Sequence, residues 1–67
     1  MEYKYNVYIV EIATGKAVGV TGMDMSEKRA EKRVMTTLSM VNRKEYFVDM
    51  VDVDSEDIKK YNSDLHE

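Results

Sequence analysis

The apolar and polar residues of the chain follow two different periods, which divide it into short strands and one long helix. Residues 3–12 are mostly Tyr, Val and Ile, with apolar side chains at both odd and even positions. A strand that is apolar on both faces is typical of the centre of a covered sheet. We therefore predict a central strand over residues 3–12.

A turn and a shorter strand follow this segment. Gly15 is typical of a tight turn, because glycine adopts positive φ at little cost. Residues 16–21 then resume the strand pattern, with two valines on one face. Because Gly19 and Gly22 weaken the strand propensity, we expect an edge strand that ends early.

A helical period covers residues 26–41. Ser26 is placed to cap this helix, Asp24 is the rival cap, and Asn42 is a reasonable stop. We predict one long amphipathic helix, whose inner stripe consists of Ala30, Val34, Leu38 and Val41.

Two short elements complete the chain. Residues 45–53 form a third strand pattern, with Tyr46, Val48 and Met50 on one face and Phe47, Val51 and Val53 on the other. Asp54 or Ser55 then caps a short final helix that carries Ile58, Tyr61 and Leu65 on one side. We expect residues 62–67 to fray, because they end the chain.

The order of elements is β-β-α-β with a C-terminal helical turn, which predicts an α+β fold. A hairpin joins the first two strands, and a right-handed crossover through the long helix places the third strand parallel to the second. The predicted three-stranded antiparallel or mixed sheet has the order 2-1-3, with the long helix on one face. The other face needs a cover, which is the final helix, a second subunit or a partner. We expect residues 1–67 to form a single domain, because the chain has room for one core.

Composition narrows the classes of protein. The chain has no cysteine, which excludes disulfides and thiolate zinc sites and favours a cytoplasmic protein. No apolar run approaches the length of a membrane span, so we expect no membrane partner. The formal net charge of −3 is divided, with a balance of +2 over residues 1–47 and −5 over residues 48–67. A basic middle and an acidic end indicate two candidate interaction surfaces.

The basic candidate comes from a repeat of Glu-Lys-Arg at residues 27–29 and 31–33. Four-residue spacing stacks like charges along one side of a helix, which also is an ordinary way to solvate its outer face. We predict that the arc binds a protein partner, with nucleic-acid phosphates as the alternative. In that alternative, tyrosines stack on bases. The arc consists of Lys28, Arg29, Lys32 and Arg33, and the tyrosines are Tyr3, Tyr5, Tyr8 and Tyr46.

The acidic candidate is a strip near the third strand and final helix. It resembles the beginning of a calcium-binding loop, but Asp57 stands where that loop needs glycine and no glutamate closes it. We therefore expect no metal ion and no cofactor, and interpret the strip as a second partner surface that docks on basic protein or mimics DNA phosphates. Its residues are Asp49, Asp52, Asp54, Glu56 and Asp57.

Catalytic chemistry finds little support in this sequence. His66 is the only histidine and lies next to the C-terminal residue, and without cysteine the usual nucleophile–base pairs are missing. We expect no catalytic residues and predict that the protein is not an enzyme.

The arrangement of elements over residues 3–53 resembles that of small phage-encoded accessory and inhibitor proteins. This resemblance rests on the arrangement alone and identifies no site residue, but it implies a compact protein that acts by binding. We therefore predict a small intracellular protein–protein interaction module, an adaptor or inhibitor encoded by a phage or mobile element. The alternatives are a nucleic-acid-binding domain that uses the basic helix, and a structural homodimer that buries Phe47, Val51 and Val53.

Overall fold

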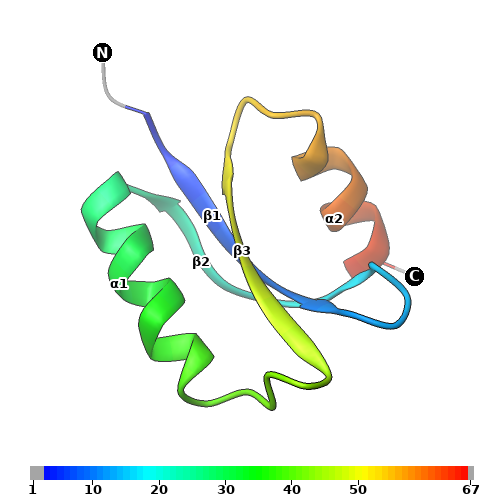
Figure 1. Ribbon diagram of the computed structural model, residues 1–67. Coiled ribbons are helices and arrows are strands. Elements are labelled where there is room, and N and C mark those ends of the chain that lie inside the picture. Colours follow the sequence, from blue (N-terminus) through cyan, green and yellow to red (C-terminus); the bar gives the residue numbers. More distant parts are fainter. Residues whose placement is uncertain (1–2, 67) are drawn as a thin grey trace.

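The computed structural model describes residues 3–66, which form three strands and two helices (Figure 1). The sheet is antiparallel throughout and has the order β2-β1-β3, so the predicted α+β fold and strand order are confirmed. The elements are β1 (Tyr5–Glu11), β2 (Ala17–Met25), α1 (Glu27–Leu38), β3 (Tyr46–Asp52) and α2 (Asp57–Leu65).

The two helices lie on opposite sides of the sheet, and β1 runs through the centre between them (Figure 1). Successive residues of β1 point to opposite faces. Val7 pairs with Met50, which lines a groove together with Val34 of α1, so this face belongs to α1. Tyr8 belongs to the opposite cluster, where it packs with Tyr61 of α2. Of the three covers considered for the second face, the structure therefore has α2 of the same chain.

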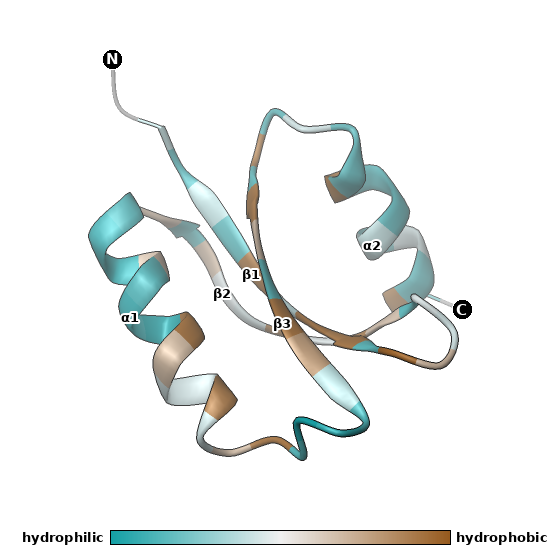
Figure 2. Cartoon of the chain, viewed as in Figure 1, coloured by the Kyte–Doolittle hydropathy of each residue, from teal (hydrophilic) through white to brown (hydrophobic). Residues whose placement is uncertain are grey.

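Hydrophobic residues concentrate on the strands and on parts of both helices (Figure 2). The cluster between the sheet and α2 contains buried residues of all three strands and of α2, with Ile58 and Leu65 packed against it. Each helix thus buries its apolar stripe on one side of a three-layer structure. The residues of this cluster are Tyr8, Val10, Ala17, Val51 and Tyr61.

A polar network lies within the α2 side of the core. The Tyr8 hydroxyl donates a hydrogen bond to Asn62 Oδ1 over 2.9 Å and accepts one from Asn6 Nδ2 over 3.0 Å. Asn6 Oδ1 in turn accepts a hydrogen bond from the backbone N–H of Asp24 over 2.9 Å. Asn6 is buried, but both ends of its amide are satisfied, so its burial carries little penalty.

The prediction that β2 ends early is wrong. The strand continues past Gly22 to Met25, with register irregularities against β1. The bond from Asp24 to the buried Asn6 side chain holds the distal end of β2 against β1. Asp24 was expected as a rival helix cap, but it lies within β2 and has a positive φ of 53°.

α1 is shorter than predicted and ends at Leu38, with Ser39 as its C-terminal cap. The carbonyl of Asn42, the expected stop, instead accepts hydrogen bonds from the backbone N–H groups of Glu45 and Tyr46. Asn42 therefore shapes the turn that leads into β3. At the other end, Ser26 occupies the predicted cap position without a side-chain capping bond.

α2 begins at Asp57, after Glu56 rather than after the predicted Asp54 or Ser55, and it extends through Leu65. Asp64 Oδ2 accepts a hydrogen bond from the N–H of Ala17 over 3.1 Å, so the last turn contacts β2. The structure does not test fraying of residues 62–67 in solution, but this contact favours an ordered last turn over the expected fraying. Residue 67 lies outside the described residues. Within residues 3–66, neither helix is long and apolar enough to cross a membrane.

Candidate partner-binding surface

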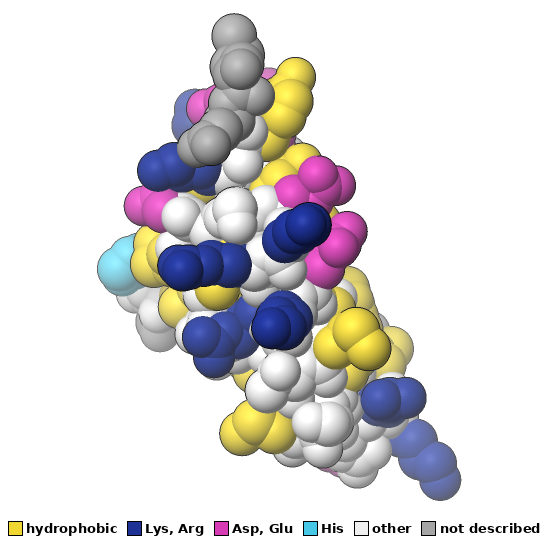
Figure 3. Space-filling model, turned by 90° about the vertical axis from the view of Figure 1, so that its left-hand side faces the viewer, with side chains coloured by type: hydrophobic (Ala, Val, Ile, Leu, Met, Phe, Trp, Pro, Cys, Tyr) yellow, Lys and Arg dark blue, Asp and Glu magenta, His cyan; other side chains and the backbone are white. Residues whose placement is uncertain are grey.

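The outer side of α1 carries the predicted basic arc. All four of its cations are exposed, while Ala30 on the inner side is completely buried. Figure 3 shows Lys and Arg side chains gathered along the middle of this side of the molecule. We call this surface the basic face, and it consists of Lys28, Arg29, Lys32 and Arg33.

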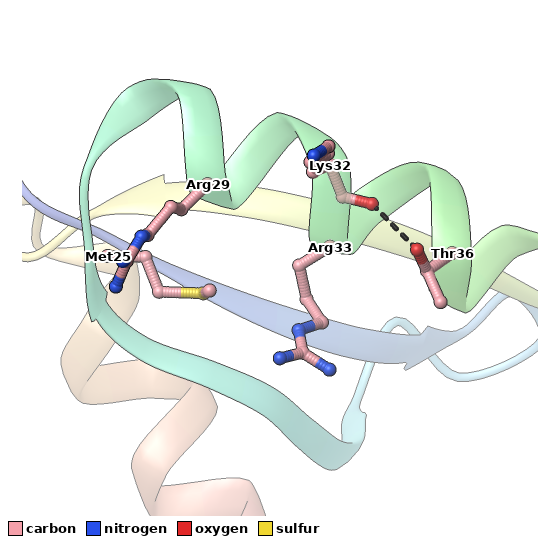
Figure 4. A pocket seen from close by; sticks show the side chains of 5 residues that line it. All are labelled: Met25, Arg29, Lys32, Arg33 and Thr36. Atoms are coloured by element: carbon pink, nitrogen blue, oxygen red, sulfur yellow. Dashed lines mark hydrogen bonds between the residues drawn. The ribbon is translucent and has the colours of Figure 1, made fainter.

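The basic face opens on one side into a groove between α1 and β2 (Figure 4). This open groove has a volume of about 430 Å³. Figure 4 shows the side chains of Arg33 and Met25 directed into the space between α1 and β2, with Arg29 beside them. The groove is lined by Met25, Arg29, Lys32, Arg33 and Thr36.

The acidic members of the repeat lie on the other side of α1. Glu31 lines a separate groove with Met35 of the helix and Met50 of β3. Burial raises the pKa of Tyr5, and the neighbouring charges of Glu27 and then Asp52 of β3 raise it further. α1 therefore separates its charges, because Arg29 and Arg33 line the groove beside β2 while Glu31 lines the groove beside β3.

The floor of the groove depends on a glycine. A Cβ atom at Gly22 would collide with the Met25 side chain and would lie 3.5 Å from Cγ of Arg33. Because Gly22 has no side chain, the stems of these two residues can lie against the β2 backbone. Thr36 completes the groove, and its hydroxyl donates to the Lys32 carbonyl over 3.0 Å.

The cations of the basic face are not neutralised by the fold. Within residues 3–66, their side chains form no ion pair with a carboxylate of the chain. Within these residues the cations therefore make no local ion pair with Glu27 or Glu31, and Glu31 instead lines the groove beside β3. The positive charge remains available to an acidic partner.

The acidic strip is divided by the structure. Asp49 pairs with Tyr8 on the α2 side of the sheet, whereas Asp52 pairs with Tyr5 on the α1 side. Asp49 is also engaged, because it accepts a hydrogen bond from the Tyr61 hydroxyl over 2.6 Å. The exposed residues of the strip lie in the turn before α2 and at the first position of this helix. They are Asp54, Glu56 and Asp57.

The grooves and carboxylates offer no organised chemical centre in the described part of the chain. Within residues 3–66, no group of three or more His, Asp or Glu side chains is placed to hold a metal ion. His66 is exposed at the end of α2. The main charged feature of the described surface is the group of four exposed cations on α1.

Sequence patterns did not identify three residues at the groove, because none of the three carries a clear sequence signal for binding. Met25 and Thr36 carry no charge pattern, and Gly22 was interpreted as a strand terminator. The grouping depends on β2 continuing to Met25, which is a tertiary effect.

No family model matches the chain, and no curated protein or solved structure gives a significant match. The resemblance to small phage-encoded proteins therefore stays a prediction, and the functional argument rests on the surface itself.

Proposed function

We propose that this protein is a small binding module that docks an acidic partner protein on the basic face of α1, as an adaptor or inhibitor. The observation that carries this proposal is the sorting of charge on α1. Arg29 and Arg33 line one open groove beside β2, while Glu31 lines another beside β3. Charges of one sign on one side of a helix give that side a positive potential, which favours a partner of the opposite sign.

Charge complementarity gives such a surface its steering and its specificity. Single exposed ion pairs contribute little energy, about 0–1 kcal/mol each, so several must act together. The basic face offers four exposed cations, and Met25 adds an apolar contact in the groove. Open grooves of this kind suit association rather than catalysis.

A protein partner is favoured over nucleic acid by two observations. The net charge of −3 opposes long-range attraction of a polyanion such as DNA or RNA. Among the tyrosines considered for base stacking, Tyr8 is fully buried and hydrogen-bonded inside the core. It cannot stack on a base without disrupting the α2 side of the core.

Affinity capture from a bacterial lysate tests the proposal. The tagged protein is compared with K32E/R33E, and with K59E/K60E as a control that makes the same charge change on exposed residues of α2. We expect defined proteins that survive nuclease treatment to be retained by the wild type and the α2 control and lost from K32E/R33E. Circular dichroism verifies that both variants fold.

Two outcomes would overturn the proposal. If K32E/R33E retains every protein as well as the wild type does, the basic face does not bind the partner. Retention that disappears after nuclease treatment would replace the protein partner with nucleic acid.

A further inference from the structure

β2 forms an open edge of the sheet directly beside the basic face. Among residues 3–66, this strand pairs with β1 on one side only. It has nine residues, lacks proline and carries Asp24 as its single charged residue. Natural edge strands are usually shortened, charged, bulged or covered, because their free N–H and C=O groups recruit other strands. Of these devices β2 has only the bulges.

Two backbone N–H groups near the ends of β2 already have partners within the chain, one on α2 and one on β1. The N–H of Ala17 is bonded to Asp64 of α2, and the N–H of Asp24 is bonded to Asn6. The stretch between them, residues 18–23, is where an added strand would pair. Register irregularities against β1 interrupt this stretch, so an added segment can pair only with the short regular pieces between them.

The two faces beside this edge differ in chemistry. On the α1 side, Arg29 and Arg33 line the groove above β2, and the Met25 side chain lies between them (Figure 4). Gly22 makes room for the stems of Met25 and Arg33 against the β2 backbone. On the α2 side, Val20 pairs with Tyr8 and is 40% exposed. Val18 is more exposed and lines a second groove together with Leu65 of α2. Side chains of an added strand alternate between these two faces.

We propose that the partner docks as an extended segment that adds a strand to the outer edge of β2. Its acidic side chains lie under Arg29 and Arg33, and its alternate apolar side chains lie beside Val18 and Val20. The backbone bonds supply affinity and the alternation supplies specificity. This inference rests on the proposed function. It specifies the partner segment as one in which acidic and apolar residues alternate.

The same charges argue against a second copy of this chain as the occupant. Antiparallel pairing of β2 with β2 would place both α1 helices on the same face of one continuous sheet. Arg29 and Arg33 of the two copies would then face each other across the junction, and like charges there are unfavourable. An acidic strand meets no such repulsion on the α1 side.

The test uses fluorescence anisotropy with a labelled peptide of alternating Glu and Val, about eight residues long to match a typical strand. We expect saturable binding to the wild type and to K59E/K60E, and affinity weaker by about tenfold or more for R29E/R33E. Two further peptides carry N-methyl groups on every Glu or on every Val. Because alternate N–H groups of a strand point to opposite edges, one of these peptides should lose binding and the other keep it.

The outcomes separate the strand inference from the proposed function. Equal binding of both N-methylated peptides and the unmodified one would overturn strand addition, while leaving attraction to the basic face intact. Failure of the unmodified peptide to bind would also overturn it, because the probe has the stated chemistry. A stable dimer that the peptide dissociates would show that a second copy occupies the edge instead.

Discussion

The Tyr61 hydroxyl donates a hydrogen bond to Asp49 Oδ2 over 2.6 Å, which joins α2 to β3. The ring of Tyr61 also packs on Tyr8, with 5.0 Å between the ring centroids. A hydrogen bond to a carboxylate is shorter and stronger than one between neutral groups. α2 is therefore held to the sheet by an apolar contact and a charge-assisted hydrogen bond from one side chain.

Removing this hydroxyl should weaken the fold. We expect Tyr61→Phe to lower the free energy of unfolding by about 1.5–3 kcal/mol, because the half-buried Asp49 loses its donor. Urea denaturation measures the change. Tyr3→Phe is the control, since Tyr3 is 62% exposed and its variant should unfold like the wild type. Identical unfolding midpoints for Tyr61→Phe and the wild type would contradict the importance of this bond.

The same residue should make stability decrease at alkaline pH. Burial and then the hydrogen bond to Asp49 raise the pKa of Tyr61 well above its ordinary value of 10.0. Above pH 10 the unfolded chain loses this proton while the folded chain keeps it. The contribution of Tyr61 is thus complete below pH 10 and declines above it, by about 1.4 kcal/mol per pH unit.

Denaturation between pH 7 and 11 checks this dependence. Lysines also titrate at alkaline pH, so the relevant quantity is the stability difference between the wild type and Tyr61→Phe. We expect this difference to be constant to about pH 10 and to shrink above it. A difference that grows with pH would show that the sign is wrong.

Two residues with positive φ should respond to substitution in opposite directions. Gly15 has a φ of 71°, and no atom lies within 4 Å of a Cβ placed there, so the cost of Gly15→Ala is confined to the backbone. We expect a loss of about 1 kcal/mol for Gly15→Ala, and a gain of up to about 1 kcal/mol for Asp24→Gly. Thermal denaturation measures both. Equal stability of Asp24→Gly and Asp24→Ala would contradict the backbone explanation.

The last turn of α2 should be ordered through its contact with β2. Asp64→Ala removes the acceptor of the buried Ala17 N–H and should cost about 1–3 kcal/mol. Ser63→Ala is the matched control, because Ser63 is exposed on the same turn. Hydrogen exchange provides the direct measurement, with protection expected for Ala17 and for residues 62–65. Exchange of residues 62–65 at unprotected rates would show that this end frays.

The sequence was sufficient for the order of elements and the faces of the strands, because both follow from local periodicity. Two apolar faces on β1 correctly placed it in the centre, and the spacing from Ala30 to Leu38 correctly gave the inner side of α1. The exposure of the basic arc also followed, since the side opposite a buried stripe faces solvent.

The tertiary structure decided what depends on contacts between distant residues. Asn6 holds Asp24 and thereby extends β2, and this extension brings Met25 to the groove beside Arg33. Thr37 is buried because its hydroxyl bonds to Thr21 on β2, which no helical pattern reveals.

The acidic strip and the cover of the second face illustrate the same limit. Residues near one another along the chain, such as Asp49 and Asp52, were separated because an odd spacing in a strand sends them to opposite faces. Asp49 then found its partner on α2, twelve positions further along, and α2 itself became the cover. Local pattern determined the elements of this protein, while long-range hydrogen bonding and packing determined where they end and which polar side chains are engaged within the fold.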